Sequence, residues 1–247
     1  MNLNNNTILI SGGSAGMGFE IAKQLTEKGN HVIITGRDKQ RLETAAAKLN
    51  NVTAILFDVT NETEVDQLVS RLNADFPNLN VLINNAASAY AYDILSGQKA
   101  WEKAADEINT NYISLIRLTE KLLPQLLQQK ASAVVNVSSI AAIAPDTKVP
   151  TYSASKAAVN SYTQSLRFAL RNTVVKVFEL MPPLVNTEFS KEIGGENGIP
   201  PAQVATEFVN AFEKDEYEIH VGVTAKIFEL ARISPTIALN AINGVQE

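Results

Sequence analysis

Tyr152 and Lys156 could together transfer a proton. They are four residues apart in Tyr-Ser-Ala-Ser-Lys, at the start of an expected helix, so both side chains lie on one helical face. A tyrosine with its ordinary pKa of about 10 is a weak acid–base catalyst at neutral pH. A neighbouring lysine cation, or the positive charge of an oxidised nicotinamide, would favour the phenolate and lower that pKa. The pair predicts protonation of a carbonyl oxygen as hydride arrives, or deprotonation of an alcohol in reverse.

The hydroxyl of Ser139 could act on the same substrate oxygen. Ser139 ends an expected strand in Val-Ser-Ser, 13 residues before Tyr152, and a hydroxyl there can orient a carbonyl for reaction. Simpler interpretations exist, because Tyr-x3-Lys is common at exposed helix starts and a small residue can merely cap a strand. The three side chains together favour proton transfer at one site.

A glycine-rich turn directly follows the first expected strand and precedes an amphipathic helix. Its glycines are spaced Gly-x3-Gly-x-Gly, so the backbone can turn tightly and approach a pyrophosphate at the free N–H groups of the helix. This position between a strand and a helix indicates a dinucleotide site, and a turn without a ligand is the alternative. The residues expected to contact the dinucleotide here are Gly12, Ser14, Gly16, Met17 and Gly18.

The end of the second expected strand favours NADP(H) over NAD(H). NAD-preferring sites usually place a carboxylate there for the ribose 2′-hydroxyl, whereas an arginine accommodates a 2′-phosphate. Gly36 occupies the acid position, and Arg37 and Asp38 follow it. Ser14 could donate a further hydrogen bond to the phosphate. Two alternatives remain, since Asp38 could pair with Arg37 and neutralise it, or Arg37 could be a solvated residue before a helix.

Two further strand ends face the same expected site. The third strand ends in Asp58 and Val59, where the carboxylate could accept a hydrogen bond from the adenine amino group. The fourth is followed by Asn85 and Ala86, which are small or polar where the chain would pass beneath the cofactor. We expect all four residues to contact the dinucleotide.

Short β-branched runs alternate with helical patterns along the whole chain. Each run is continuously apolar, as in strands that helices cover on both faces. This order predicts an α/β fold of the Rossmann type, with a doubly wound, mostly parallel seven-stranded sheet flanked by helices on both faces. The expected strands are Thr7–Ser11, His31–Thr35, Val52–Asp58, Val81–Asn84, Ala133–Ser138, Val174–Leu180 and Glu218–Val221, and the expected helices are Met17–Lys28, Lys39–Leu49, Glu62–Asp75, Trp101–Gln129, Ser153–Leu170 and Pro201–Glu213.

One irregular segment interrupts this pattern, at about residues 183–200. It is rich in proline and glycine and follows the sixth strand, so we expect a substrate lid there, within a single NAD(P)-binding domain that spans residues 1–247. Tyr90 and Tyr92 could line the pocket beneath it or be packing residues. The other residues expected to line this pocket are Ser139, Phe228, Leu230 and Ile233. Because this lining is mostly apolar, it predicts a hydrophobic small-molecule carbonyl or alcohol substrate.

The composition excludes several function classes. The chain has no cysteine, so disulfide, thiolate and iron–sulfur chemistry are excluded. Its two histidines are too few for a metal cluster, and its net charge of -5 argues against nucleic acid binding. Residues 1–7 do not resemble a signal peptide, and the first apolar run is too short to span a bilayer. We therefore expect a cytoplasmic protein with no metal, nucleic acid or membrane partner.

Together, these motifs resemble the short-chain dehydrogenase/reductase family in its single-domain form. Ala87 and Pro183 depart from the family, which has glycine at both positions, and neither change removes a catalytic group. The run from Glu179 to Glu188 also resembles the DltE-like bacterial subgroup, which implies no particular substrate. The matching residues are in family order over most of the chain: Gly12, Gly16, Gly18, Asp58, Asn84, Asn85, Ala86, Asn111, Ser139, Tyr152, Lys156 and Pro182 to Thr187.

The resemblance implies catalytic roles for four residues. Tyr152 would be the general acid/base, and Ser139 would position the carbonyl. Lys156 would lower the pKa of the phenol and hold the nicotinamide ribose. Asn111 would hold a water molecule that links Lys156 to solvent.

The resemblance also implies cofactor contacts and an assembly. Thr187 and the backbone of Val185 would bind the nicotinamide carboxamide, and Pro182 would also contact the cofactor. Family members commonly pair two long helices between subunits, here Trp101–Gln129 and Ser153–Leu170, which implies a homodimer or homotetramer.

The leading interpretation is an NADP(H)-dependent oxidoreductase that interconverts a carbonyl and an alcohol by hydride transfer. The alternative is a non-catalytic NADP(H)-binding regulator or scaffold, although such a sensor needs neither Tyr152 nor Lys156. A third possibility is an epimerase or dehydratase of the longer Tyr-x3-Lys relatives, but the short C-terminal region up to Glu247 leaves little room for their substrate domain.

Overall fold

The apolar runs of the sequence form one parallel sheet. The computed structural model describes residues 1–97 and 99–245, and seven strands lie within these residues. They are β1 (Thr7–Ile10), β2 (His31–Gly36), β3 (Val52–Leu56), β4 (Leu79–Asn84), β5 (Ser132–Val137), β6 (Val175–Met181) and β7 (Glu218–His220). Their order is β3-β2-β1-β4-β5-β6-β7, and every neighbouring pair is parallel. All strands therefore end at one edge of the sheet, where the order reverses beside β1.

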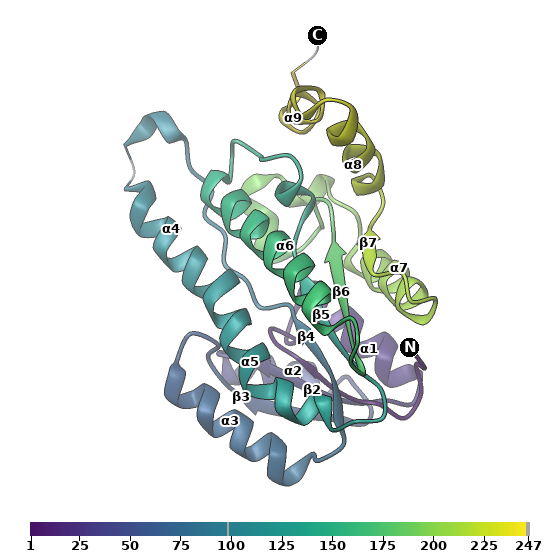
Figure 1. The fold of residues 1–247 in the computed structure, drawn as a ribbon. Helices are drawn as coiled ribbons and strands as arrows, with labels where there is room; N and C mark the ends of the chain where they lie inside the picture. The colour runs from purple at the N-terminus through teal and green to yellow at the C-terminus, as the bar shows by residue number, and fades with distance from the viewer. Residues whose placement is uncertain (98, 246–247) are drawn as a thin grey trace.

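Helices cover both faces of this sheet (Figure 1). They are α1 (Gly16–Glu27), α2 (Lys39–Ala46), α3 (Glu62–Asp75), α4 (Ala100–Ile108), α5 (Ser114–Leu127), α6 (Pro150–Leu170), α7 (Pro201–Glu213), α8 (Thr224–Ile233) and α9 (Pro235–Asn243). Ile8 and Ile10 of β1 pack in a core cluster with α1, α2 and α7, whereas Leu9 joins a second cluster with α3, α5 and α6. Successive strand residues point to opposite faces, so a strand covered on both sides is apolar throughout.

The structure confirms the predicted α/β fold and parallel sheet, and it confirms the long helix expected near Trp101–Gln129 with one difference. The chain runs from α4 into α5 through a π-helical turn, η2 (Asn109–Ile113), which the sequence did not predict. Such a turn inserts one extra residue into the helical ladder. Both flanking helices keep their amphipathic pattern, so the periodicity of the sequence does not reveal the insertion.

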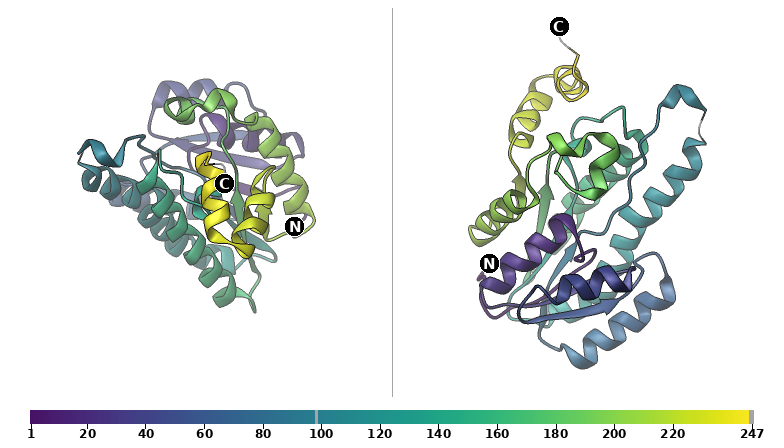
Figure 2. Two further views of the ribbon diagram at one scale, coloured as in Figure 1. Left: turned by 90° about the horizontal axis from the view of Figure 1, so that it is seen from above. Right: turned by 180° about the vertical axis from the view of Figure 1, so that it is seen from behind.

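The C-terminal segment forms two helices, α8 and α9, beyond the helices expected from the sequence. Ile227 of α8 and Ala238 of α9 pack against Ile140 and Ala144, in and after the 3₁₀ turn η3 (Ile140–Ala142) that follows β5. Figure 2 shows α8 and α9, in yellow, at the end of the molecule toward which the strands run. An apolar wall therefore stands beside the carboxyl end of β5.

The segment expected to be a lid contains two 3₁₀ turns, η4 (Glu188–Ile193) and η5 (Gly195–Asn197). A parallel bridge between Val185 and Ile199 ties its two ends together. One further 3₁₀ turn, η1 (Ile94–Ser96), precedes α4. Within the described residues, none of the helices combines the length and apolar character needed to cross a membrane.

Candidate active site

The glycine turn after β1 lies directly against the chain that follows β4. Gly12 adopts a φ of 66°, and a Cβ atom there would lie 3.0 Å from the Cα of Ala86. At Gly18 an added Cβ would lie 2.5 Å from both the carbonyl oxygen of Gly12 and the Nδ2 of Asn85. Only glycine fits such close approaches. The N–H groups of Asn85 and Ala86 both donate to the Ser11 hydroxyl, at 3.0 and 3.1 Å, which fixes the two loops together.

The N-terminus of α1 is suited to bind an anion. The helix begins after Ala15, whose methyl side chain cannot cap it. The first-turn N–H groups and the helix dipole are therefore available to a phosphate. A Cβ at Gly16, where φ is 53°, would lie 3.1 Å from the Thr187 side chain, so the lid segment also approaches this turn closely. The turn thus fits a dinucleotide pyrophosphate.

A cavity of about 770 Å³ runs along this edge of the sheet. It extends from the end of β2, past the glycine turn, to the first turn of α6. Most of the residues predicted to contact the dinucleotide line it, namely Gly12, Ser14, Gly16, Met17, Gly18, Arg37, Asp58, Val59, Asn85, Ala86, Tyr152, Lys156 and Thr187. The structure thus brings the ends of β1, β2, β3 and β4 together with α6, as the spacing of the motifs implied.

Tyr152 and Lys156 meet at one end of this cavity. Both lie near the start of α6, and the Lys156 ammonium is 5.6 Å from the centre of the Tyr152 ring. The ammonium donates a 2.8 Å hydrogen bond to the carbonyl oxygen of Val137, at the end of β5. The Ser139 hydroxyl, two residues further on, accepts a 3.1 Å hydrogen bond from the N–H of Ala141 and lies close enough to the phenol to lower its pKa. The three side chains that the sequence predicted to act together are therefore adjacent.

Burial controls the protonation of this group. Desolvation raises the pKa of Tyr152 to about 12, with the Ser139 hydrogen bond opposing the rise and the Glu107 carboxylate adding to it. Desolvation also lowers the pKa of Lys156 to about 8, and the Glu179 carboxylate opposes that fall. The net pKa of Tyr152 therefore lies above its ordinary value, because burial outweighs the opposing hydrogen bond. The phenol is protonated at neutral pH, as an ordinary tyrosine also is. The lowering of this pKa that the family resemblance implies for Lys156 stays a prediction.

Asn111 lies within the π-helical turn η2 and is buried. Its Nδ2 donates to the Ser88 carbonyl at 2.9 Å and to the Ser155 hydroxyl at 2.8 Å, and its Oδ1 accepts from the Ser88 N–H at 2.8 Å. Asn111 therefore ties the first turn of α6 to Ser88, which lines the large cavity. π-Helical turns occur frequently at functional sites. The water-holding role that the family resemblance implies for Asn111 stays a prediction.

Three predicted cofactor residues lie in the chain after β6. The Pro182 carbonyl accepts from the N–H of Ile140 at 2.9 Å. The Val185 carbonyl accepts from the Ser190 hydroxyl, which also lies 3.3 Å from the hydroxyl of Thr187. Of the three predicted residues only Thr187 lines the large cavity; Pro182 and Val185 hold the segment in shape beside it.

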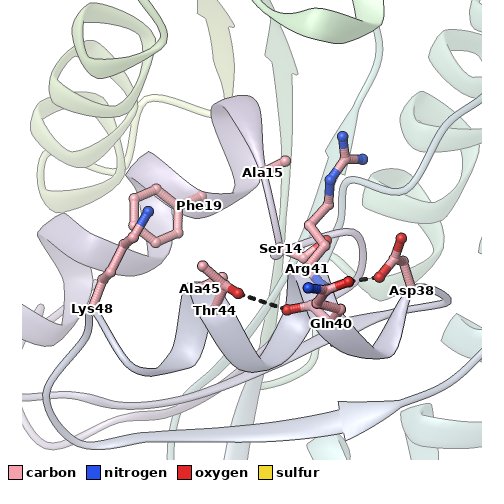
Figure 3. Close-up of a pocket in the computed structure, with 9 residues that line it drawn as sticks. All are labelled: Ser14, Ala15, Phe19, Asp38, Gln40, Arg41, Thr44, Ala45 and Lys48. Carbon is pink, nitrogen blue, oxygen red and sulfur yellow. Dashed lines mark hydrogen bonds between the residues drawn. The ribbon is translucent and has the colours of Figure 1, made fainter.

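A second cavity, of about 440 Å³, adjoins the first between α1 and α2 (Figure 3). Ser14, Asp38 and Arg41 line both cavities. Figure 3 shows the Arg41 guanidinium extending from α2 to a position beside Ser14 and Ala15. Arg41 was not among the residues predicted to contact the cofactor, although it lies only four residues after Arg37, in the first turn of α2.

The Asp38 carboxylate caps α2 by accepting a 2.9 Å hydrogen bond from the N–H of Arg41. The ion pairs of the described residues do not include one between Asp38 and Arg37. In this structure Asp38 therefore caps α2 and does not neutralise Arg37.

The far end of the large cavity is partly aromatic. Phe189, on the lid turn η4, lies with its ring centre 6.1 Å from that of Tyr152 and is half exposed. Tyr92 is buried and donates to the hydroxyl of Thr151, which supports the packing interpretation for that residue. Tyr90 donates a 2.9 Å hydrogen bond to Asp106. The lining of the cavity includes Phe189 and neither tyrosine.

No group of three or more histidine, aspartate or glutamate side chains within residues 1–97 and 99–245 is arranged to hold a metal ion.

Known proteins share this architecture. A family model described as short chain dehydrogenase matches residues 6–198. The chain is 36% identical over 224 residues to an uncharacterized oxidoreductase named DltE from Bacillus subtilis strain 168, with 89% of each protein covered. A short chain dehydrogenase from Burkholderia cenocepacia in complex with NADP matches with a TM-score of 0.86 at 25% identity, over 98% of both chains. A short chain dehydrogenase/reductase from Burkholderia phymatum in complex with NAD has a TM-score of 0.86 at 20% identity, over 100% of this chain and 99% of that one.

The buried ammonium makes stability depend on pH. Burial lowers the pKa of Lys156 to about 8, whereas a lysine in the unfolded chain keeps its proton up to about pH 10.4. Between these values the unfolded chain binds more protons than the folded protein, so stability rises with pH. From about pH 8 to about pH 9.5 we expect the wild type to gain on the order of 2 kcal/mol of unfolding free energy relative to Lys156→Met, measured by urea unfolding.

The control is Lys39→Met, which removes a lysine whose side chain is 74% exposed. It should follow the wild type at both pH values. A difference between the wild type and Lys156→Met that does not change with pH would show that Lys156 keeps its proton throughout this range.

Proposed function

The chain belongs to the short-chain dehydrogenase family, and from this premise we propose that it is an NADP(H)-dependent oxidoreductase that interconverts a carbonyl compound and its alcohol. The observation that carries the proposal is the Tyr152 phenol, which lies beside Ser139 and has the Lys156 ammonium 5.6 Å from its ring centre. This group stands at the end of a cavity that begins at a glycine turn and an uncapped helix N-terminus. Such a cavity can hold an extended dinucleotide with its reactive ring beside a proton donor.

The cofactor contacts follow from the lining of the cavity. The pyrophosphate would lie on Gly12, Gly16 and the first turn of α1, and the adenine beside Asp58 and Val59. The nicotinamide would lie between Asn85–Ala86 and Thr187, with Val185 and Pro182 shaping that end. When bound, the nicotinamide supplies or accepts the hydride.

A preference for NADP(H) is supported by two arginines where the adenosine ribose would lie. Arg37 follows β2 directly and Arg41 lies one helical turn later, and both line the large cavity. Ser14 adds a hydroxyl beside Arg41, and Lys48 lines the smaller cavity. A 2′-phosphate carries negative charge and accepts charge-assisted hydrogen bonds, which arginine provides in pairs.

Proton transfer is assigned to Tyr152. In reduction the phenol donates its proton to the substrate oxygen, which the Ser139 hydroxyl also contacts; in oxidation the phenolate takes the alcohol proton. Lys156 stabilises the phenolate and holds the nicotinamide ribose. Asn111 would relay a proton between Lys156 and solvent through water. A phenol with a pKa of about 12 is protonated before the reaction. The negative charge that it gains in reduction develops on a ring whose centre lies 5.6 Å from the Lys156 ammonium.

The substrate end of the cavity favours an apolar carbonyl compound. Phe189 faces Tyr152 from η4, and we propose that residues 183–200 close over the substrate as a lid. The apolar cluster of η3, α8 and α9 stands behind Ser139. A hydrophobic or aromatic substrate would bury its side chain between these surfaces.

We also propose that the protein is a homo-oligomer that pairs α5 and α6 between subunits. Three large apolar side chains are exposed in this region: Ile113 in η2, Leu127 in α5 and Phe168 in α6, the last of which is 68% exposed. These residues point away from the sheet, and burying them against a second copy would remove apolar surface from water.

Tyr152→Phe tests the assigned acid. With NADPH and a panel of hydrophobic ketones and aldehydes, we expect turnover to fall by at least about 100-fold, while the Kd for NADPH stays within a few-fold of the wild type. Tyr162→Phe, on the same helix but outside the cavity lining, should keep its activity. Full turnover by Tyr152→Phe on any accepted substrate would exclude the mechanism. Tight NADPH binding without turnover by the wild type would favour a regulator or scaffold instead.

Arg37→Ala and Arg41→Ala test the cofactor preference. Because each removes a charge-assisted hydrogen bond to a 2′-phosphate, each should weaken NADPH binding by about 10-fold or more, with little change for NADH. The readout is a fluorescence titration with both cofactors. Lys39→Ala is the matched control, since Lys39 precedes Arg41 on the same helix and lines neither cavity. A wild type that binds NADH as tightly as NADPH would overturn the preference.

Phe168→Glu tests the subunit interface. We expect sedimentation velocity at micromolar concentrations to show an oligomeric wild type and a shift of the variant toward monomer, because a buried unpaired carboxylate is unfavourable. Leu95→Glu changes a residue that is 91% exposed on η1 and should leave the oligomer intact. A monomeric wild type, or dissociation by Leu95→Glu alone, would contradict the assignment.

A further inference from the structure

Glu179 is a fully buried carboxylate to which the proposed mechanism gives no role. It lies in the interior of β6, between β5 and β7, and its residue has no exposed surface. Burial of a carboxylate is unfavourable unless donors or an opposite charge compensate it. The compensating groups therefore indicate what the carboxylate does.

Three donated hydrogen bonds hold this carboxylate. The Ser138 hydroxyl donates to its Oε1 at 2.5 Å, and the Nδ2 of Asn160 lies 3.0 Å from Oε1 and 3.1 Å from Oε2. The Oδ1 of Asn160 accepts from Gln164 at 2.8 Å, so the amide must turn its NH₂ group toward Glu179. An ionised carboxylate only accepts hydrogen bonds, and these donors favour that form.

The same two elements hold the Lys156 ammonium. Lys156 donates to the carbonyl of Val137, the residue before Ser138, and Asn160 lies one turn after Lys156 on α6. Glu179 and Lys156 are thus both held by the end of β5 and by α6. Side-chain donors hold the Glu179 carboxylate, and a backbone carbonyl holds the Lys156 ammonium.

The other charges near Glu179 are already engaged with each other. Arg167 of α6 forms a 2.9 Å ion pair with Glu218 of β7, and both act on Glu179 with opposite sign. Burial raises the pKa of Glu179, and the hydrogen bonds from Ser138 and Asn160 oppose that rise. Glu179 is the charged group whose field acts on Lys156, and it favours the ammonium against the effect of burial.

We propose that Glu179 is a positioning residue for the reaction: its carboxylate keeps the buried ammonium of Lys156 charged at neutral pH, and Ser138 and Asn160 hold it in place for that purpose. The catalytic meaning of this arrangement rests on the proposed function, because it is the charged form of Lys156 that stabilises the phenolate. The electrostatic coupling itself does not depend on any reaction.

Glu179→Gln tests the coupling directly. The substitution keeps the shape and removes the charge, so the pKa of Lys156 should fall further below about 8, by about one unit. The titration is followed by ¹³C NMR of the lysine ε-carbons in protein labelled with ¹³C-lysine, and the Lys156 signal is assigned by its loss in Lys156→Met. Glu107→Gln is the matched control, since Glu107 is equally buried but acts on Tyr152. This substitution should leave the pKa of Lys156 unchanged.

Asn160→Ala serves as a second variant, because Asn160 is only partly buried and its loss should permit folding. Removing two of the three donated bonds raises the pKa of Glu179, so the Lys156 titration should move in the same direction by a smaller amount. If the pKa of Lys156 is unchanged in both variants, the proposal is overturned. A purely structural role of Glu179 would lower the thermal stability of Glu179→Gln without changing that pKa.

The pH profile of kcat/KM for NADPH-dependent carbonyl reduction gives the catalytic readout. A pKa that is one unit lower reduces the charged fraction of Lys156 about threefold at pH 7.5, so the alkaline limb should move to lower pH and the rate at pH 7.5 should fall to about one third. If the NMR titration shifts while the wild type reduces no carbonyl, the coupling stands and the proposed function fails. If it does not shift while the wild type is active, the function stands and the role of Glu179 is rejected.

Discussion

The polar contact between α6 and the carboxyl ends of β5 and β6 is the interaction on which the site depends. Helices usually pack on a sheet through apolar side chains, yet several sheet-facing contacts of α6 are hydrogen bonds. Lys156 donates to the carbonyl of Val137, the Thr163 hydroxyl accepts from Asn136, and Arg167 donates to a carbonyl of β6. These bonds have fixed directions, unlike apolar contacts, so they fix both the rotation and the height of the helix. The phenol of the first turn is thereby aimed at the end of the glycine turn.

This way of docking has an electrostatic consequence. A helix fixed to a sheet by charged and polar groups must bury them, and burial disfavours the charged form of each. Tyr152 and Lys156 both shift toward their neutral forms, to pKa values of about 12 and about 8. The phenol is protonated at neutral pH with or without this shift, so burial only extends that state to higher pH. For the ammonium the shift is adverse, and a second buried charge, Glu179, opposes it. Burial therefore makes the charge of Lys156, and not that of Tyr152, depend on its surroundings.

The sequence predicted the elements better than it predicted their contacts. Apolar runs located each strand within a few residues, and the residues predicted from the glycine spacing and the strand ends all line the large cavity. The π-helical turn around Asn111 was missed because an inserted residue leaves the apolar pattern intact. Arg41 was missed because a charged residue in the first turn of a helix looks solvated, and its direction depends on the capping of α2 by Asp38. The polar face of α6 and the burial of Glu179 follow from packing, which periodicity does not record.

The proposed lid adds a mechanical link between the two ends of the proposed reaction. The hydroxyl of Ser190, itself buried, donates to the carbonyl of Val185 and lies 3.1 Å from that of Thr187, so it folds η4 onto the segment expected to hold the nicotinamide. Phe189, the adjacent residue, faces Tyr152. The bridge between Val185 and Ile199 holds the two ends of this segment together. A movement of Phe189 away from the substrate would therefore also shift the backbone beside the cofactor. In the proposed mechanism, substrate enclosure and cofactor placement are consequently coupled through one serine.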